Sequence, residues 1–561
     1  MTPNFGVKIY HSIISSWSWW WQVDNHQDHL ARAILTVSVP LLLFLWYQYI
    51  RNDRTSLPPG PYGLPVVGYL PFLASDLHER FTHMSHRYGP IFSLWLGSKL
   101  HVVVNSVELA KVVARDLDQT FANRTPPVAA LTITYGGIDI AWSNNNAHWR
   151  KLRKLLVSQV LSNANLDSCA GFRTDEVRKV VRDVYGRIGK KIDINKVAFD
   201  AELNVVTGML WGCSEGKDSS DIGDGFREVE FKIIELLGAP NISDFIPMLS
   251  WFDLQGRQRE MQKQKEHLDR ILDNIIRGRS NGNSRKMDED GRKDFVQILL
   301  ELKDQKDSPI SLNIDQIKAL LFVSCIILQL LDIIRSCKTD FVTKRMLMIP
   351  KWLRQDILTA ATDTTSTMVE WVMAEILHHP EVKTKIQEEL NDVLGMNSIV
   401  EECHLPKLAY LDAVIKETFR IHPPLPLLIQ RSPDESCTVG GYLIPKGTIV
   451  YINVWAIHRD PRNWPNSLEF KPERFLKGKW DYNGNNLKFL PFGVGRRICP
   501  GIPLGEKMLV YILASLLHSF EWRLSEDEDF EVSDEFGFVT KKRKPLIAIP
   551  SQRLSDARLY L

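Results

Sequence analysis

The feature that most constrains this chain of 561 residues is a glycine-interrupted loop near its carboxyl end, Phe492-Gly493-Val494-Gly495-Arg496-Arg497-Ile498-Cys499-Pro500-Gly501. The loop leads into an apolar stretch, Leu504 to Phe520, whose three-to-four periodicity predicts a helix. Its glycines let the backbone approach a flat surface closely, and Arg497 can neutralise a carboxylate there. Proline directly after Cys499 suits a first helical turn, so we expect the sulfur near a positive helix end, which favours thiolate.

Composition narrows the class of protein. Hydrophobic residues make up 44% and charged residues 24%, which is typical of a globular chain with a large core. The 69 basic and 67 acidic residues nearly balance, which argues against nucleic acid as a partner. The 7 cysteines show no zinc-like spacing and fit a reducing compartment. A lone cysteine is more often buried and inert than reactive, so the loop needs independent support.

The amino-terminal region predicts a membrane anchor. Residues 33–50 are almost all apolar, about the minimum needed to span a bilayer core of roughly 30 Å. Arg51 and Arg54 follow and keep the rest of the chain cytosolic. A buried core helix is the alternative. We expect an extension at 1–30, a single-pass anchor at 31–50, a basic and proline-rich hinge at 51–68, and a catalytic domain at 69–561.

Periodicity in the body predicts a single large domain, mainly α with minor antiparallel β. Alternating runs at Ile91 to Leu96 and His101 to Val104 predict a small antiparallel sheet. The tract from 278 to 293 is rich in charge and predicts a solvated loop. Helical periodicity appears at Trp149 to Leu161, Phe172 to Ile188, Gln262 to Ile276, Pro380 to Leu394, Leu408 to Ile421 and Leu504 to Phe520.

Four further motifs accompany the cysteine loop. They are Trp149-Arg150-Lys151-Leu152-Arg153, Ala360-Ala361-Thr362-Asp363-Thr364-Thr365, Glu417-Thr418-Phe419-Arg420 and Phe470-Lys471-Pro472-Glu473-Arg474-Phe475. Together with the loop they resemble the cytochrome P450 family, from about Pro58 to Ile549. With the anchor and hinge, the chain is similar to the plant microsomal branch, in particular to terpenoid and flavonoid hydroxylases. The resemblance implies the cytochrome P450 fold.

The resemblance assigns one set of residues to haem b (iron protoporphyrin IX). It implies that the Cys499 thiolate is the iron ligand. Trp149 and Arg153, four apart on one helix face, would hold a haem propionate. Without the other motifs, that pair would indicate an ordinary amphipathic helix. The remaining cofactor-binding residues that the resemblance implies are Phe492, Gly493, Arg497 and Arg431.

A second set would form a structural triad. In the family pattern Glu417 and Arg420 are buried with Arg474 and brace the haem loop, where loss of one partner leaves a buried charge. By themselves, Glu417 and Arg420 indicate a surface pair worth a few tenths of a kcal/mol.

A third set belongs to the distal side. The resemblance implies that Thr364 and Asp363 supply protons for O–O cleavage, which the Cys499 thiolate favours from the opposite face. An Asp–Thr pair alone would indicate a helix cap. Ala361 stands where the family more often has glycine. The substrate-lining residues implied are Ile133, Ala360 and Leu427, all apolar, which favours a small lipophilic substrate.

Taken together, we expect a monooxygenase in the endoplasmic reticulum membrane. It would take electrons from NADPH through NADPH–cytochrome P450 reductase and insert one atom of O₂ into a C–H bond of a terpenoid. A flavonoid or phenylpropanoid is the alternative substrate. A haem-thiolate isomerase or dehydratase, and a catalytically silent haem- or lipid-binding protein, are the alternative functions.

One segment departs from the family pattern. Residues Phe322 to Arg354 fit no motif, and joining Leu321 to Gln355 restores a continuous helical pattern. Pro350 inside the segment would break a helix at a cost of roughly 3 kcal/mol. Our hypothesis is a retained intron or gene-model artefact, and the alternative is a genuine looped-out insertion. If the segment is present, a distorted distal helix would bind haem and activate oxygen poorly.

Overall fold

The computed structural model describes residues 26–52, 56–73, 76–134, 136–137, 139–211, 232–267, 352–478, 480–525 and 531–561. The amino-terminal extension up to residue 25, the predicted loop at 278–293 and the predicted insertion up to residue 351 lie outside the described residues. The predicted helix at 262–276 is described only to residue 267, where residues 257–267 are helical.

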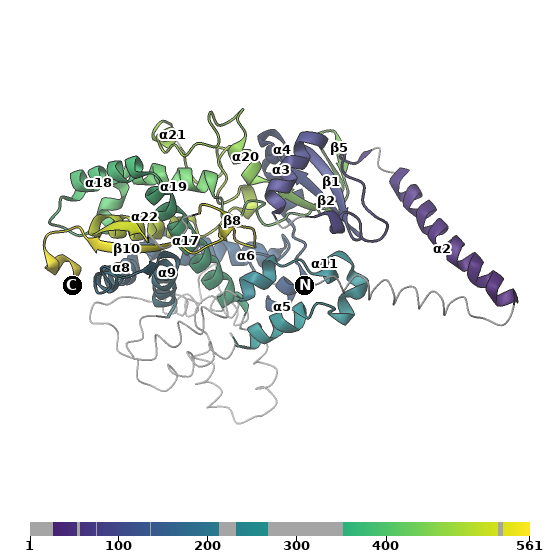
Figure 1. The fold of residues 1–561 in the computed structure, drawn as a ribbon, viewed down its shortest axis with the longest axis horizontal. Coiled ribbons are helices and arrows are strands. Elements are labelled where there is room, and N and C mark those ends of the chain that lie inside the picture. Colours follow the sequence, from purple (N-terminus) through teal and green to yellow (C-terminus); the bar gives the residue numbers. More distant parts are fainter. Residues whose placement is uncertain are drawn as a thin grey trace, which may run out of the picture.

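Among the described residues, long runs of helices are separated by a few short strands (Figure 1). Helices are α2 His26–Asn52, α3 Leu77–Tyr88, α4 Val107–Lys111, α5 Val128–Ile133, α6 Ala147–Leu155, α7 Asn163–Ser168, α8 Ala170–Tyr185, α9 Ile194–Trp211, α11 Ile242–Phe245, α17 Trp352–His378, α18 Pro380–Leu394, α19 Ala409–Ile421, α20 Val454–Arg459, α21 Glu473–Leu476 and α22 Ile502–Ser519. Strands are β1 Ile91–Leu96, β2 Lys99–Val104, β3 Ile192–Asp193, β4 Cys437–Val439, β5 Tyr442–Ile444, β6 Ile449–Ile452, β7 Phe520–Leu524, β8 Asp534–Glu535, β9 Lys541–Lys542 and β10 Ile547–Gln552.

The predicted antiparallel pair is confirmed as β1 and β2, joined by a tight turn at Gly97. Gly97 has φ +59°, which glycine adopts without strain, and a Cβ there would lie 2.2 Å from the Phe245 carbonyl oxygen. The sequence did not predict the third strand, β6, which pairs parallel to β2 with His101 opposite Ile449.

The helical body surrounds α22 and α17, which pack against each other (Figure 1). From Met508 to Ser519 every residue of α22 is buried, as expected of a helix apolar on all sides. The structure confirms the predicted bounds of α18, because Pro380 occupies its first turn and Gly395 follows its last residue with φ +71°. Helix α17 begins at Trp352, three residues before the predicted resumption at Gln355.

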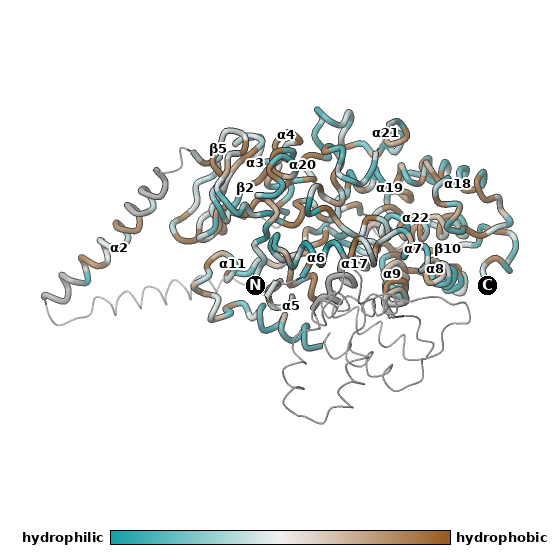
Figure 2. The backbone as a smooth tube through the Cα atoms, turned by 180° about the vertical axis from the view of Figure 1, so that it is seen from behind, coloured by the Kyte–Doolittle hydropathy of each residue, from teal (hydrophilic) through white to brown (hydrophobic). Residues whose placement is uncertain are grey.

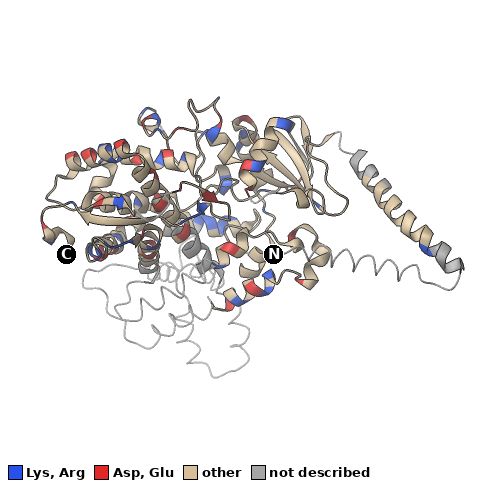
Figure 3. Cartoon of the chain, in the orientation of Figure 1, with Lys and Arg blue, Asp and Glu red and all other residues tan. Residues whose placement is uncertain are grey.

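Helix α2 covers the predicted anchor and extends away from the body (Figure 1). Its central part carries no charged residues (Figure 3). The apolar side chains between Ile34 and Phe44 are exposed, and Figure 2 colours the backbone of α2 by hydropathy. Among the helices that the structure describes, none reaches the combination of length and apolar character that a bilayer crossing requires. The predicted single-pass anchor is therefore not shown.

The proline-rich segment after α2 packs on the sheet and does not form a free spacer. Ser93 donates its backbone N–H to the Pro59 carbonyl at 2.8 Å and its hydroxyl to the Pro58 carbonyl at 2.7 Å. A Cβ on Gly60 would lie 1.7 Å from the Ser93 oxygen, so only glycine fits against β1. These contacts fix where the chain leaves α2 relative to the sheet.

Candidate functional site

The cysteine loop is a tight, internally bonded turn. The Cys499 N–H donates to the Phe492 carbonyl at 3.0 Å, and the Gly501 N–H lies 3.4 Å from the Cys499 sulfur. Gly493 and Gly495 have φ +75° and +69°. A Cβ on Gly495 would lie 2.3 Å from the Ala114 carbonyl, so this glycine is needed for the close approach of the loop to residues 112–116.

The start of the following helix corrects one expectation. Helix α22 begins at Ile502 with Gly501 as its N-cap, and the proline of its first turn is Pro503 rather than Pro500. The Cys499 sulfur therefore lies just before the helix, within reach of one N–H, that of Gly501.

The acidity of Cys499 corrects a second expectation. Burial raises the pKa of the Cys499 thiol, although the Gly501 N–H and the charge of Arg153 act in the opposite direction. Desolvation of the sulfur thus outweighs the helix end and the cation in the protein alone. A bound metal cation is what converts such a buried thiol to thiolate.

Arginine side chains converge around the loop. Arg497 donates to the carbonyls of Ala122, at 2.6 Å, and Ser143, and Arg431 donates to the Val494 carbonyl at 2.6 Å. Arg153 donates to the Ile498 carbonyl at 2.5 Å, next to the cysteine. A fourth arginine, Arg124, lies close enough for its charge to interact with those of the other three, and the sequence did not predict it. We call these four residues the arginine cluster: Arg124, Arg153, Arg431 and Arg497.

The arginine cluster holds more positive than negative charge. The pKa of Arg497 is lowered to about 9, first by burial and then by the charges of Arg431 and Arg153, while Asp139 and Asp118 act in the opposite direction. Burial and then the neighbouring arginines also lower the pKa of Arg124. The guanidinium groups of Arg124, Arg431 and Arg497 are buried and that of Arg153 is half-buried, while Asp139 and Asp118 are the carboxylates that oppose them, so an excess of positive charge is left for an anionic ligand.

These residues fit a haem on the chemistry of the donor set. The loop offers a half-buried sulfur, a soft ligand suited to iron. The excess positive charge of the arginine cluster suits the anionic propionates of iron protoporphyrin IX. Phe492 packs beside the loop against Phe419, with ring centroids 5.2 Å apart.

The Trp149 indole departs from its expected contact. Its N–H donates to the Ile140 carbonyl at 2.9 Å, so this group is engaged by the backbone and does not point to an anion. The Trp149 ring instead lies under the guanidinium of Arg497, 4.0 Å from the ring centroid, and near that of Arg153, 5.7 Å from it. Trp149 and Arg153 thus lie on one face of α6 as predicted, and the Trp149 ring makes cation–π contacts with the two arginines.

The three residues of the predicted triad contact one another. Glu417 accepts from Arg420 at 2.8 Å through both carboxylate oxygens and from Arg474 at 2.9 Å. Glu417 and Arg420 are 0% exposed, so this is a buried pair and not a surface one.

The triad is linked to the cysteine loop through His458. Arg420 donates to the His458 carbonyl at 2.8 Å, and the His458 ring Nε2 accepts the Leu490 N–H at 2.9 Å, just before the loop. Burial lowers the pKa of His458 to about 3, so the ring stays neutral and keeps this acceptor. Sequence reasoning missed His458, which belongs to no short motif.

On α17, Asp363 is fully buried and Thr364 is partly buried. The Asp363 carboxylate pairs with the Lys541 ammonium on β9, with 2.5 Å between Oδ1 and Nζ. Sequence reasoning missed Lys541. Ala360 lies in α17, but its side chain falls outside the described residues.

The predicted substrate-lining residues are not brought together. Ile133 on α5 is buried in the large helical core, whereas Leu427 is buried in a separate cluster with Phe81 and Phe92 beside the sheet. Each is a core residue among the described contacts.

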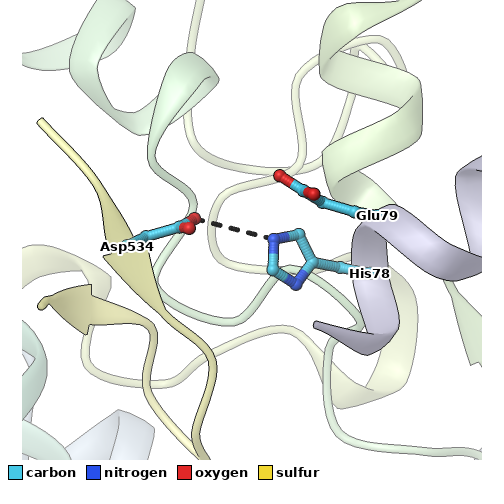
Figure 4. Close-up of side chains that lie close together, drawn as sticks. All are labelled: His78, Glu79 and Asp534. Atoms are coloured by element: carbon cyan, nitrogen blue, oxygen red, sulfur yellow. Dashed lines mark ion pairs between the residues drawn. The ribbon is translucent and has the colours of Figure 1, made fainter. Parts of the chain in front are cut away.

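A separate group of polar side chains lies between α3 and β8 (Figure 4). His78 is buried, and its Nε2 is 3.6 Å from the Asp534 carboxylate, with Glu79 beside them. The charge of Arg459 acts on both Asp534 and Glu79. Because a cation already balances these carboxylates, we interpret the group as an ion-pair network that attaches β8 to α3.

The chain is similar to a large family of known proteins. The family described as Cytochrome P450 matches residues 58–325 and 353–549. Sugiol synthase from Salvia miltiorrhiza is 32% identical over 90% of this chain and 96% of its own. Geraniol 8-hydroxylase from Catharanthus roseus is 33% identical over 93% and 99%, and flavonoid 3',5'-hydroxylase from Campanula medium is 32% identical over 93% and 96%.

Among solved structures, a zebra fish cytochrome P450 with progesterone superposes with a TM-score of 0.67. The alignment covers 84% of this chain and 99% of that one at 23% identity. At this identity the likeness establishes the fold, which is mainly helical as the sequence predicted.

Proposed function

The chain belongs to the cytochrome P450 family, and we propose that it hydroxylates a small terpenoid at the endoplasmic reticulum membrane with electrons from NADPH–cytochrome P450 reductase. It is a haem-thiolate monooxygenase. When bound, the haem supplies the iron that activates O₂, so that one oxygen atom enters a C–H bond of the substrate and the other leaves as water.

The proximal residues would bind and orient the cofactor. Cys499 would supply the sulfur ligand, and the metal would shift its buried thiol to the thiolate. The arginine cluster would bind the propionates by charge-assisted hydrogen bonds, with Trp149 holding Arg497 from the other side of its guanidinium plane. The observation that carries the function is this pairing of a half-buried cysteine sulfur with the excess positive charge of the arginine cluster.

The distal residues would manage protons. Asp363 presents a buried carboxylate, and the hydroxyl of Thr364 follows it on the same turn of α17. A carboxylate beside a hydroxyl can accept a proton and pass it on within a site from which bulk water is excluded.

The substrate class is supported by the relatives. Two of the relatives above carry terpenoid names, geraniol 8-hydroxylase and sugiol synthase, and one is a flavonoid hydroxylase. A flavonoid remains the second candidate because of the third relative.

Membrane attachment is part of the proposal. The exposed apolar side chains of α2, from Ile34 to Phe44, have no covering surface among the described residues and would enter the bilayer. The catalytic body would then lie on the cytosolic side, beside the reductase.

We also propose that residues 322–354 are absent from the working protein. The family match supports this, because it breaks between residues 325 and 353. Sequencing of the transcript decides the point: abundant message encoding this segment, together with active protein made from it, would contradict the proposal.

The function is tested in microsomes that contain the chain, with and without residues 322–354, and the reductase. Geraniol, ferruginol and a flavanone serve as probes. We expect an NADPH-dependent mono-oxygenated product of geraniol or ferruginol. A product from the flavanone alone would favour the flavonoid alternative. A thiolate-type carbon monoxide spectrum without any turnover would favour a silent haem protein, and peroxide rearrangement without reductase would favour an isomerase.

A further inference from the structure

Lys541 is a residue near the distal site that no predicted motif contains. Its ammonium lies 2.5 Å from Oδ1 of Asp363, where the Lys541 side chain is 26% exposed and that of Asp363 is 0% exposed. The pair joins α17 to β9, which lie 178 residues apart in the chain. It therefore links the buried acid to a side chain that reaches solvent.

The backbone that carries Lys541 is held at several points. Asp534 on β8 pairs with His78 of α3 (Figure 4), and Phe536 stacks on the His78 ring with centroids 5.1 Å apart. Just before β9, the Thr540 N–H donates to the Pro424 carbonyl at 2.8 Å. The position of the Lys541 ammonium is therefore set by the fold and not by a free loop.

The neighbouring lysine has a different role. Lys542 points to the other face of the strand, where its ammonium lies 5.3 Å from the Trp371 ring centroid and donates to the Glu531 carbonyl at 2.5 Å. Lys541 therefore pairs with Asp363, whereas Lys542 has different partners because successive side chains of a strand point to opposite faces.

A buried carboxylate is stable as an anion only where cations and hydrogen bonds replace water. We propose that Lys541 is the positioning residue that keeps the Asp363 carboxylate ionised and aimed for proton delivery. The inference rests on the proposed monooxygenase function and names the group that regulates its proton-donating acid. Lys541 acts through Asp363 and does not itself contact substrate.

Oxygen stoichiometry without any substrate measures proton delivery. Peroxide release follows NADPH + H⁺ + O₂ → NADP⁺ + H₂O₂, whereas full reduction follows 2 NADPH + 2 H⁺ + O₂ → 2 NADP⁺ + 2 H₂O. Cleavage of the O–O bond needs both protons on the same oxygen atom, and hydrogen peroxide is released when each oxygen atom receives one proton. The ratio of NADPH to O₂ and the peroxide yield therefore report the function of Asp363, and no substrate need be known.

The test compares variants of the haem-loaded full chain with reductase and NADPH. For Lys541→Gln we expect the water-forming fraction to fall roughly tenfold, which is less than the roughly 100-fold or more that loss of a proton-transfer group itself costs, because Asp363 is still present. Lys541→Arg keeps the charge and should recover more than half of that fraction. Lys544→Gln is the matched control, because it removes the same charge from an exposed lysine after the same strand and should behave as wild type.

A double-mutant cycle separates positioning from general damage. If Lys541 works through Asp363, Lys541→Gln should cause no further loss in an Asp363→Asn background. Infrared difference spectra give a readout independent of turnover. We expect a protonated-carboxyl C=O band in Lys541→Gln relative to wild type, and its absence when Asp363→Asn is added.

Several results would overturn the inference: wild-type stoichiometry in Lys541→Gln, losses from the two single variants that multiply in the double variant, or no carboxyl band. Failure of the proposed function looks different. It appears in the wild-type protein as absence of the thiolate carbon monoxide spectrum or of NADPH-dependent O₂ uptake, and the infrared comparison then still decides whether Lys541 holds Asp363 ionised.

Discussion

Replacement of Glu417 by glutamine tests whether the buried triad stabilises the cysteine loop. The change removes the charge that faces Arg420 and Arg474, so the Arg420 guanidinium, 0% exposed, is left without a counter-charge and with a neutral amide oxygen and the backbone carbonyls of His458, Ser467 and Glu469 as acceptors. Loss of one partner of a buried ion pair costs about 3–5 kcal/mol. This is a large part of the roughly 5–15 kcal/mol by which a folded protein is stable.

The expected shift in melting temperature follows from chain length. An unfolding entropy of about 2.1 cal/mol/K per residue gives roughly 1.2 kcal/mol/K over 561 residues. A loss of about 3–5 kcal/mol therefore lowers Tm by roughly 3–4 °C. Because Arg420 is linked through His458 to Leu490, we also expect a lower haem content per chain.

The assay is thermal unfolding of the purified chain, together with haem content. Glu235→Gln is the matched control, since it makes the same change in an exposed pair with Lys232 and should shift stability by less than about 0.5 kcal/mol. Equal Tm and haem content in Glu417→Gln and wild type would refute the claim that this pair is buried and bonded as described.

Two further predictions concern charge. Arg497→Met should weaken haemin binding to the apoprotein by roughly 10–100-fold, which corresponds to one charge-assisted hydrogen bond. Arg496→Met changes an exposed side chain and should bind haemin as the wild-type protein does. Equal losses of affinity in both variants would contradict a specific anion site. Burial raises the pKa of Glu202 to about 8 from 4.5, against the lowering effect of Arg173, so the folded state holds a proton that the unfolded chain has released. The stability this gives is complete below the unfolded pKa and is lost as pH rises through the folded one, so Glu202→Gln should raise Tm at about pH 8 and change it little at about pH 5 in a melting series; the opposite order would show Glu202 to be ionised in the fold.

Local patterns predicted local structure well. Helix α18 has the predicted bounds because Pro380 and Gly395 mark its ends, and β1 and β2 follow from alternation around a short glycine turn. The triad lies together as the family resemblance implied, whereas the spacing of Glu417 and Arg420 by itself indicated only a surface pair.

Features that depend on distant residues were missed. Strand β6 joins the sheet from more than 340 residues away, and no local pattern encodes a parallel pairing of this kind. Arg124 and Lys541 reach their sites only through tertiary packing. The Cys499 thiol was expected to ionise easily because the sequence indicates a helix end beside it, but the sequence does not show how far the fold desolvates the sulfur.

The central claim is that the sulfur of Cys499 binds iron. X-ray absorption at the iron edge of the haem-loaded protein tests it most directly, because sulfur scatters differently from nitrogen and oxygen. We predict one sulfur neighbour of iron in the wild-type protein and none in Cys499→Ala. Iron surrounded only by nitrogen and oxygen in wild type, or a sulfur neighbour that persists in Cys499→Ala, would contradict it.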